Sequence, residues 1–107
     1  MVTGASGGFG SGLVQLARLR GARVIALVGS GKEDQARALG TELVIARDTE
    51  NLPAAVAKVA GGRPIDVVAD VVGGDVFADL LSVLRPMGRY VTAGAKQSTE
   101  NGFVLLV

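Results

Sequence analysis

Short aliphatic runs alternate along this chain with longer segments in which apolar residues recur every three or four positions. The short runs are bounded mostly by glycine or proline and predict buried strands at residues 23–28, 42–46, 65–72, 89–93 and 103–107. Residues 1–3 are typical of the end of one more strand, because a core strand usually needs about five residues. The longer segments predict helices at residues 11–20, 32–39, 51–60 and 75–84.

This alternation is typical of βαβ units, which build a parallel sheet covered by helices on both faces. We therefore predict an α/β fold with a Rossmann-type, doubly wound parallel sheet of about six strands in the order 3-2-1-4-5-6. In that order the truncated first strand lies in the middle of the sheet.

Local signals refine the helix and turn assignments. The first helix is expected to bury one apolar face, which carries Leu13, Leu16 and Ala17. Asp75 is expected to cap the fourth helix, whose buried positions include Leu81 and Leu84. Residues 85–88 (Arg-Pro-Met-Gly) predict a turn into the next strand.

A glycine loop at residues 2–10 (Val-Thr-Gly-Ala-Ser-Gly-Gly-Phe-Gly) joins the first strand to the first helix. Glycine weakens helices and strands by about 0.5–1 kcal/mol per residue, so its concentration here indicates a geometric role. Glycines at the start of a helix let a phosphate group come close to the backbone N–H groups, because they carry no Cβ. In the G-x-G-x-x-G pattern, however, Ala5 replaces the first glycine. We expect a pyrophosphate at Ser6, Gly7, Gly8, Phe9 and Gly10. The alternative is a surface loop that binds no ligand.

The composition of the chain excludes several classes of function. The 107 residues form one domain at most, with 49% hydrophobic but only 4% aromatic residues, which indicates an aliphatic core. A net charge of +1 gives no electrostatic argument for nucleic acid or an anionic membrane. The absence of Cys and His removes disulfides, the usual ligands of structural zinc and any imidazole base. With neither a leader nor an apolar run of about 20 residues, we expect a soluble, cytoplasmic protein.

Five stretches match one family in the same order along the chain. They are residues 2–10, 14–17 (Val-Gln-Leu-Ala), 21–25 (Gly-Ala-Arg-Val-Ile), 66–74 (Asp-Val-Val-Ala-Asp-Val-Val-Gly-Gly) and 84–91 (Leu-Arg-Pro-Met-Gly-Arg-Tyr-Val). Through them the chain resembles the cofactor-binding domain of the medium-chain dehydrogenase/reductase superfamily, nearest to its zinc-free quinone-oxidoreductase and enoyl-reductase branch.

The resemblance implies an oxidoreductase parent that transfers hydride from a nicotinamide cofactor to a quinone or an activated enone. In that family a GroES-like catalytic domain normally precedes the glycine loop and contributes much of the substrate site. We therefore expect residues 1–107 to be a cofactor-binding piece of such an enzyme, with no catalytic side chain and no metal site of its own.

Cofactor choice depends on the end of the second strand. An NAD site usually places an acid about 20 residues after the glycine loop to bind the ribose 2′-hydroxyl. Here Gly29 and Ser30 precede Lys32, and the first acid is Glu33. We therefore expect NADPH rather than NADH, with Ser30 and Lys32 toward the 2′-phosphate. Lys32 as a solvated helix-start lysine is the alternative.

Four further residues are expected at the carboxyl ends of strands. Arg47 follows the third strand, where it either contacts the adenosine end of the cofactor or pairs with neighbouring acids. Val71 and Val72 line either the ribose and nicotinamide or the core, and Gly94 lies near the nicotinamide.

Two rival functions stay open. The glycine loop also fits a short-chain dehydrogenase, but that family needs Lys four residues after its catalytic Tyr, and Tyr90 is followed there by Gly94. Tyr90 is therefore expected to be structural. A non-catalytic module that senses a dinucleotide is the second rival. The apolar segment at residues 103–107 is expected to form an edge strand through which the chain assembles into a homo-oligomer.

Overall fold

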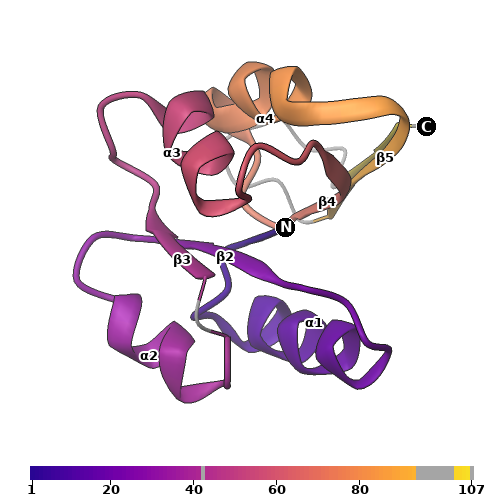
Figure 1. The fold of residues 1–107 in the computed structure, drawn as a ribbon. Coiled ribbons are helices and arrows are strands. Elements are labelled where there is room, and N and C mark those ends of the chain that lie inside the picture. Colours follow the sequence, from indigo (N-terminus) through magenta and orange to yellow (C-terminus); the bar gives the residue numbers. More distant parts are fainter. Residues whose placement is uncertain (42, 94–102, 107) are drawn as a thin grey trace.

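The computed structural model describes residues 1–41, 43–93 and 103–106. The strands are β1 (Val2–Thr3), β2 (Ile25–Val28), β3 (Leu43–Ala46), β4 (Ile65–Asp70), β5 (Leu84–Ala93) and β6 (Phe103–Leu106). The helices are α1 (Gly8–Leu19), α2 (Glu33–Ala38), α3 (Leu52–Val59) and α4 (Phe77–Val83), with a short 3-10 turn, η1, at Gly74–Val76. The alternation of strands and helices follows the hydrophobic pattern of the sequence (Figure 1).

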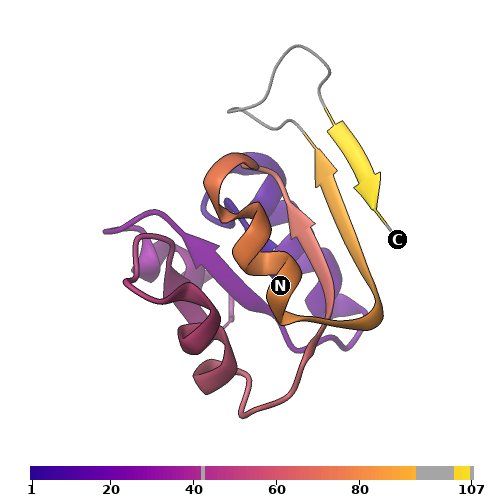
Figure 2. The same cartoon turned by 90° about the horizontal axis from the view of Figure 1, so that it is seen from above.

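The strands form one sheet in the order β3-β2-β1-β4-β5-β6, which confirms the predicted Rossmann order. β1 to β5 are parallel, but β6 runs antiparallel to β5 (Figure 2), so the prediction of a wholly parallel sheet is wrong at this edge. The reason is the length of the connection. A parallel neighbour needs a crossover of about a dozen or more residues, and only residues 94–102 separate the two strands.

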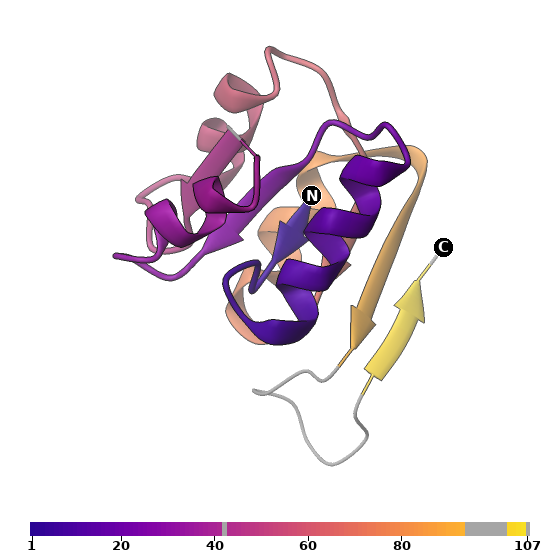
Figure 3. The same cartoon turned by 90° about the horizontal axis from the view of Figure 1, so that it is seen from below.

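Two aliphatic clusters hold helices against the two faces of the sheet. α1 and α2 cover one face (Figures 1 and 3), where the buried side chains are Val2, Ala5, Val14, Val24, Ala26, Val28 and Ala36. α3 and α4 cover the other face, around Ile25, Leu27, Ile45, Leu52, Val56, Val68, Leu80 and Tyr90, among others. Successive residues of β2 alternate between the two clusters, as the two-residue period of a strand requires.

Two predicted features of the first helix need correction. α1 begins at Gly8 rather than at residue 11, so the last three residues of the glycine loop form its first turn. Its buried positions are Gly10 and Val14, with Leu13 and Ala17 partly buried, whereas the side chain of Leu16 is 49% exposed. Leu16 has helical spacing from Leu13, but it lies at the rim of the face that packs on the sheet.

The fourth helix and its flanking strands also differ from expectation. β4 ends at Asp70 rather than at residue 72, and the N-cap position of α4 is Val76 rather than Asp75, which lies within η1. Leu84 is the first residue of β5, and the expected turn at residues 85–88 is an irregularity within that strand. The pairing jumps from Ile65↔Leu84 to Val67↔Arg89, because proline followed by a left-handed Met87 (φ 66°) interrupts the ladder.

Candidate functional site

The glycine loop presents the start of α1 at the carboxyl end of β1. Gly7 is the N-cap residue, with extended backbone angles, and no side chain caps the helix. The loop is closed by a hydrogen bond from the Gly7 N–H to the Gly4 carbonyl (3.0 Å). Because the first turn of α1 also lacks an acidic residue, its N–H groups and positive dipole end are available to an anion.

Close packing explains the glycines at the two ends of this loop. A Cβ on Gly10 would lie 2.1 Å from the Gly4 carbonyl oxygen, so glycine lets α1 approach the end of β1. Gly4 has φ +59°, and a Cβ there would lie 2.6 Å from Cγ2 of Val71. At Gly8 no atom lies within 4 Å of such a Cβ, so that side of the loop faces open space. Glycine therefore serves packing at Gly4 and Gly10, and leaves room for a ligand at Gly8.

A buried carboxylate fixes the turn that packs on Gly4. Oδ1 of Asp70 accepts hydrogen bonds from the Thr3 hydroxyl (2.6 Å) and from the N–H groups of Val72 (3.0 Å) and Gly73 (2.8 Å). The Val71 N–H donates to Oγ1 of Thr3 (3.0 Å). The backbone after β4 is thus held by side chains from β1 and β4, while the side chains of Val71 and Val72 stay half-buried.

Tyr90 completes this network from β5. Its hydroxyl donates to Oδ2 of Asp70 (2.5 Å), and its ring packs edge-on against Phe77 with centroids 5.0 Å apart. Burial by itself raises the pKa of Asp70, but the hydrogen bonds from Thr3, Tyr90 and the backbone outweigh it, so the pKa is lowered and the carboxylate is ionised. Burial and the hydrogen bond to Asp70 raise the pKa of Tyr90. Sequence reasoning missed this network, although the two acids in the apolar fourth strand were a signal.

The structural role expected of Tyr90 agrees with its burial, at 1% exposure. Its hydroxyl is engaged by Asp70 within the core, which disfavours the short-chain dehydrogenase alternative.

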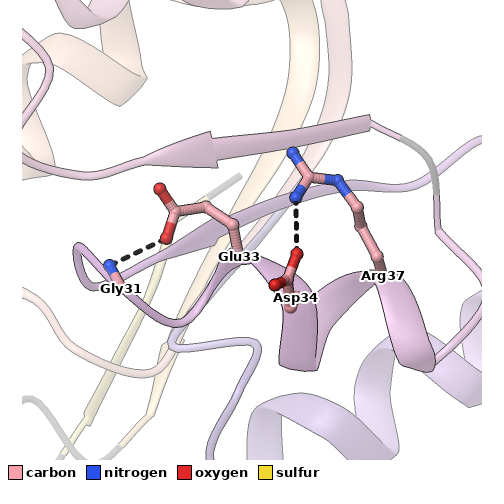
Figure 4. A network of polar contacts seen from close by, with 4 residues as sticks. All are labelled: Gly31, Glu33, Asp34 and Arg37. Atoms are coloured by element: carbon pink, nitrogen blue, oxygen red, sulfur yellow. Dashed lines mark hydrogen bonds and ion pairs between the residues drawn. The ribbon is translucent and has the colours of Figure 1, made fainter.

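The loop that follows β2 lies at the same carboxyl edge of the sheet as the glycine loop. Gly29 and Lys32 close a turn through a hydrogen bond from the Lys32 N–H to the Gly29 carbonyl (3.0 Å), and the side chains of Ser30 and Lys32 are exposed. Figure 4 shows that Glu33 folds back on this turn, where its carboxylate accepts the Gly31 N–H (2.8 Å). The first acid after β2 is therefore engaged by its own loop.

The other acid near this loop is also paired. Asp34 lies 3.1 Å from Arg37 on the same face of α2 (Figure 4). Both side chains are solvated, so the pair offsets the charge of Asp34 and adds little to stability.

The fold brings most of the predicted binding residues to one edge of the sheet. Residues 6–10 and the turn at residues 71–72 meet through Gly4, on either side of the point where the strand order reverses between β1 and β4. The Arg47 N–H donates to the Val28 carbonyl (2.7 Å), which places Arg47 beside the loop of Ser30 and Lys32. Gly94 lies outside the described residues.

A doubly wound sheet with a glycine loop and an uncapped helix at its switch point defines the class as a Rossmann-type α/β domain. Residues 8–106 match the family of zinc-binding dehydrogenases, so the chain belongs to that family, within the medium-chain dehydrogenase/reductase superfamily. The resemblance found in the sequence is thereby confirmed.

Three relatives illustrate the similarity. A crystal structure of a protein described as an alcohol dehydrogenase from Sinorhizobium meliloti 1021 superimposes with a TM-score of 0.85 at 57% identity, over 91% of this chain and 27% of that one. The 2-haloacrylate reductase of a Burkholderia species is 36% identical over 88% of this chain and 28% of its own length. CurA from Vibrio vulnificus in complex with NADPH has a TM-score of 0.77 at 29% identity, over 94% of this chain and 32% of that one.

The chain thus spans less than a third of each of these three relatives. Among the described residues, no helix is long and apolar enough to cross a membrane.

Proposed function

We propose that this chain is the NADPH-binding domain of a zinc-independent oxidoreductase that transfers hydride to a quinone or an activated enone. The observation that carries the proposal is the uncapped start of α1, reached by a glycine loop that packs on the turn after β4. This is the place in an open α/β sheet where ligands bind, beyond the carboxyl ends of the strands at a topological switch point.

The residues of the loop fit a pyrophosphate. Phosphate oxygens need N–H donors and close approach, and the first turn of α1 offers both because Gly8 leaves open space where a side chain would stand. Ser6, Gly7, Gly8, Phe9 and Gly10 would hold this group, with Gly10 setting the distance between helix and sheet. Val71 and Val72 would line the adjoining ribose.

The choice of NADPH is supported by the charges after β2. The carboxylate of Glu33 accepts the Gly31 N–H instead of facing a ribose, which leaves the exposed Ser30 and Lys32 to meet a 2′-phosphate. Arg47 lies beside the same loop. The complex of CurA with NADPH also supports the binding of a dinucleotide by this domain, because CurA is 29% identical to this chain in sequence.

The oxidoreductase activity is proposed for a larger protein. When bound, the nicotinamide ring supplies the hydride, and the task of this domain is to fix its position and exclude water. The substrate pocket and any proton donor would belong to residues outside these 107, in a GroES-like domain, because the relatives are more than three times as long. That the reaction needs no zinc stays a prediction from the resemblance to the zinc-free branch, because any zinc ligands would belong to the same absent domain. Assembly through β6 at the sheet edge, and a cytoplasmic location, stay predictions.

Calorimetric titration of the 107-residue chain with NADPH and with NADH tests the proposal. We expect NADPH to bind more tightly. Lys32→Gln should weaken NADPH about fivefold, as expected for about 1 kcal/mol from an exposed charge pair, and leave NADH nearly unchanged. Lys58→Gln, which removes an exposed lysine from the last turn of α3, is the matched control and should alter neither affinity. Equal losses for both cofactors in Lys32→Gln, or tighter binding of NADH by the unsubstituted chain, would contradict the assignment.

A further inference from the structure

One buried hydroxyl joins the two halves of the sheet where β1 and β4 end. Thr3 is the last residue of β1 and Asp70 the last of β4, and both are only 1% exposed. The Thr3 hydroxyl donates to Oδ1 of Asp70 (2.6 Å) and accepts the Val71 N–H (3.0 Å). A threonine hydroxyl has one hydrogen to donate, and here that hydrogen is used inside the protein. The Thr3 hydroxyl therefore links protein elements to each other.

This link replaces a backbone hydrogen bond between the two strands. The Ala69 N–H donates to the Met1 carbonyl (2.8 Å), as in any parallel ladder. The next N–H on the same side of β4 belongs to Val71, because backbone groups alternate along a strand. It donates to the side chain of Thr3, whereas a continued ladder would use the Thr3 carbonyl. The hydroxyl thus connects β1 and β4 at the point where their backbones separate.

The turn after β4 depends on this connection. Gly73 has φ 74° and ψ −160°, a strained backbone region that essentially only glycine adopts. The three consecutive N–H groups of residues 71–73 are bound by Thr3 and Asp70. Asp70 in turn accepts from the hydroxyls of Thr3 and Tyr90. Asp70 and Tyr90 lie on β4 and β5, so Thr3 supplies the link from this network to β1.

We propose that Thr3 is a positioning residue for the dinucleotide, whose hydroxyl sets the separation between the start of α1 and the turn at residues 71–73. This inference rests on the proposed function. A Rossmann sheet consists of two mononucleotide-binding halves, here β1 to β3 and β4 to β6, and a dinucleotide spans both. Thr3 adjoins Gly4, on which the side chain of Val71 packs. The hydroxyl therefore fixes the two parts of the binding site against each other.

Two substitutions at Thr3 separate the effect of the hydroxyl from that of side-chain packing. Thr3→Val keeps the shape of the side chain and removes the hydroxyl, whereas Thr3→Ser keeps the hydroxyl and removes a buried methyl group. We expect Thr3→Val to weaken NADPH and NADH about fivefold each, the range for one neutral hydrogen bond lost between cofactor and turn. Thr3→Ser should bind both cofactors within about twofold of the unsubstituted chain. Both variants should lower the midpoint of thermal unfolding, so a change in stability alone does not produce this contrast.

Adenosine 2′,5′-bisphosphate supplies a readout that is specific for positioning. Under the proposed function this ligand occupies only the first half of the site, from the glycine loop to Ser30 and Lys32. Its affinity therefore does not depend on the separation between the two halves. Calorimetric titration at a temperature below every unfolding midpoint should give the same affinity for this ligand in all variants.

Thr41→Val is the matched control. The Thr41 hydroxyl donates to the Val24 carbonyl (2.7 Å) in a buried site at the amino ends of β2 and β3, the edge of the sheet opposite the glycine loop. The substitution removes a buried, paired hydroxyl just as Thr3→Val does. The midpoint of thermal unfolding should therefore fall, while the affinities for all three ligands stay those of the unsubstituted chain.

Unchanged affinity of Thr3→Val for NADPH and NADH would overturn the inference, because the hydroxyl would then not set the separation. An equal loss for the adenosine bisphosphate would also overturn it, because the substitution would then disturb the glycine loop itself. If Thr3→Val does not fold, Thr3→Ser decides: retained dinucleotide affinity supports the inference, and a loss despite the retained hydroxyl contradicts it. Failure of the unsubstituted chain to bind NADPH and NADH would overturn the proposed function, a result distinct from the others, in which that chain binds.

Discussion

Gly10 and Gly12 lie two residues apart on α1, yet alanine at these positions should change stability in opposite directions. A Cβ at Gly10 would stand 2.1 Å from the Gly4 carbonyl oxygen and 2.7 Å from its carbon, both backbone atoms, whereas ordinary contacts begin near 3.4 Å. α1 would have to move away from the end of β1 by roughly 1 Å, and overpacking of this kind lowers the stability of a protein by about 1–3 kcal/mol. The gain in helix propensity offsets only about 0.5–1 kcal/mol of this.

Gly12 is the matched control because nothing lies within 4 Å of its would-be Cβ. Gly12→Ala should therefore stabilise the chain by about 0.5–1 kcal/mol from helix propensity alone. Gly10→Ala should destabilise it by about 1 kcal/mol on balance, so the two variants should differ by about 2 kcal/mol, which is the overpacking cost alone. That difference corresponds to about 8 °C or more in melting temperature for a domain of this size.

Urea unfolding followed by circular dichroism measures this difference, provided that the slopes of the two variants agree. Opposite signs relative to the unsubstituted chain would support the close approach of α1 to the end of β1. If Gly10→Ala were as stable as Gly12→Ala, α1 would not pack on the Gly4 carbonyl in solution, and the glycine loop would lack the geometry on which the proposed pyrophosphate site depends.

Three further predictions concern the buried network and the irregular strand. Asp70→Asn should lower the free energy of unfolding by about 3 kcal/mol at neutral pH, because it removes the charge of a buried carboxylate that accepts four hydrogen bonds. The hydrogen bonds hold the pKa of Asp70 in the folded chain below its ordinary value of 3.8, so unfolding titrations should show this difference in full above pH 3.8 and a decreasing difference as the pH falls through the folded pKa. A difference independent of pH would contradict an ionised Asp70. Tyr90→Phe should lower the unfolding free energy by about 1.5–3 kcal/mol in urea titrations, because one hydrogen bond to the buried carboxylate is lost, and an unchanged midpoint would argue against that bond. Met87→Gly should raise the free energy of unfolding by up to about 1 kcal/mol, and the melting temperature with it, because glycine adopts the φ of 66° without strain and the methionine side chain is 87% exposed. A clear decrease in melting temperature would mean that the methionine side chain packs in solution.

Much of the fold could be predicted because strand and helix periodicity is a local property of the chain. The runs at residues 23–28 and 42–46 predicted β2 and β3, and their alternation with helical segments predicted the parallel order of the first five strands. The concentration of glycines likewise predicted a geometric role for this loop, and the structure shows that role at Gly10, where only glycine fits the contact between α1 and the Gly4 carbonyl. The antiparallel β6 had a local signal in its short connection, residues 94–102.

Only the tertiary structure decided which polar groups in the core have partners. Thr3 and Asp70 are 67 residues apart, and their hydrogen bond depends on the register between β1 and β4. The register between β4 and β5 brings Tyr90 to the carboxylate, while the Thr92 hydroxyl has no hydrogen-bond partner in the described chain. Periodicity identifies the face of an element, but hydrogen bonding needs two atoms within about 3 Å. That separation is set by how all the elements pack together, which no single stretch of sequence encodes.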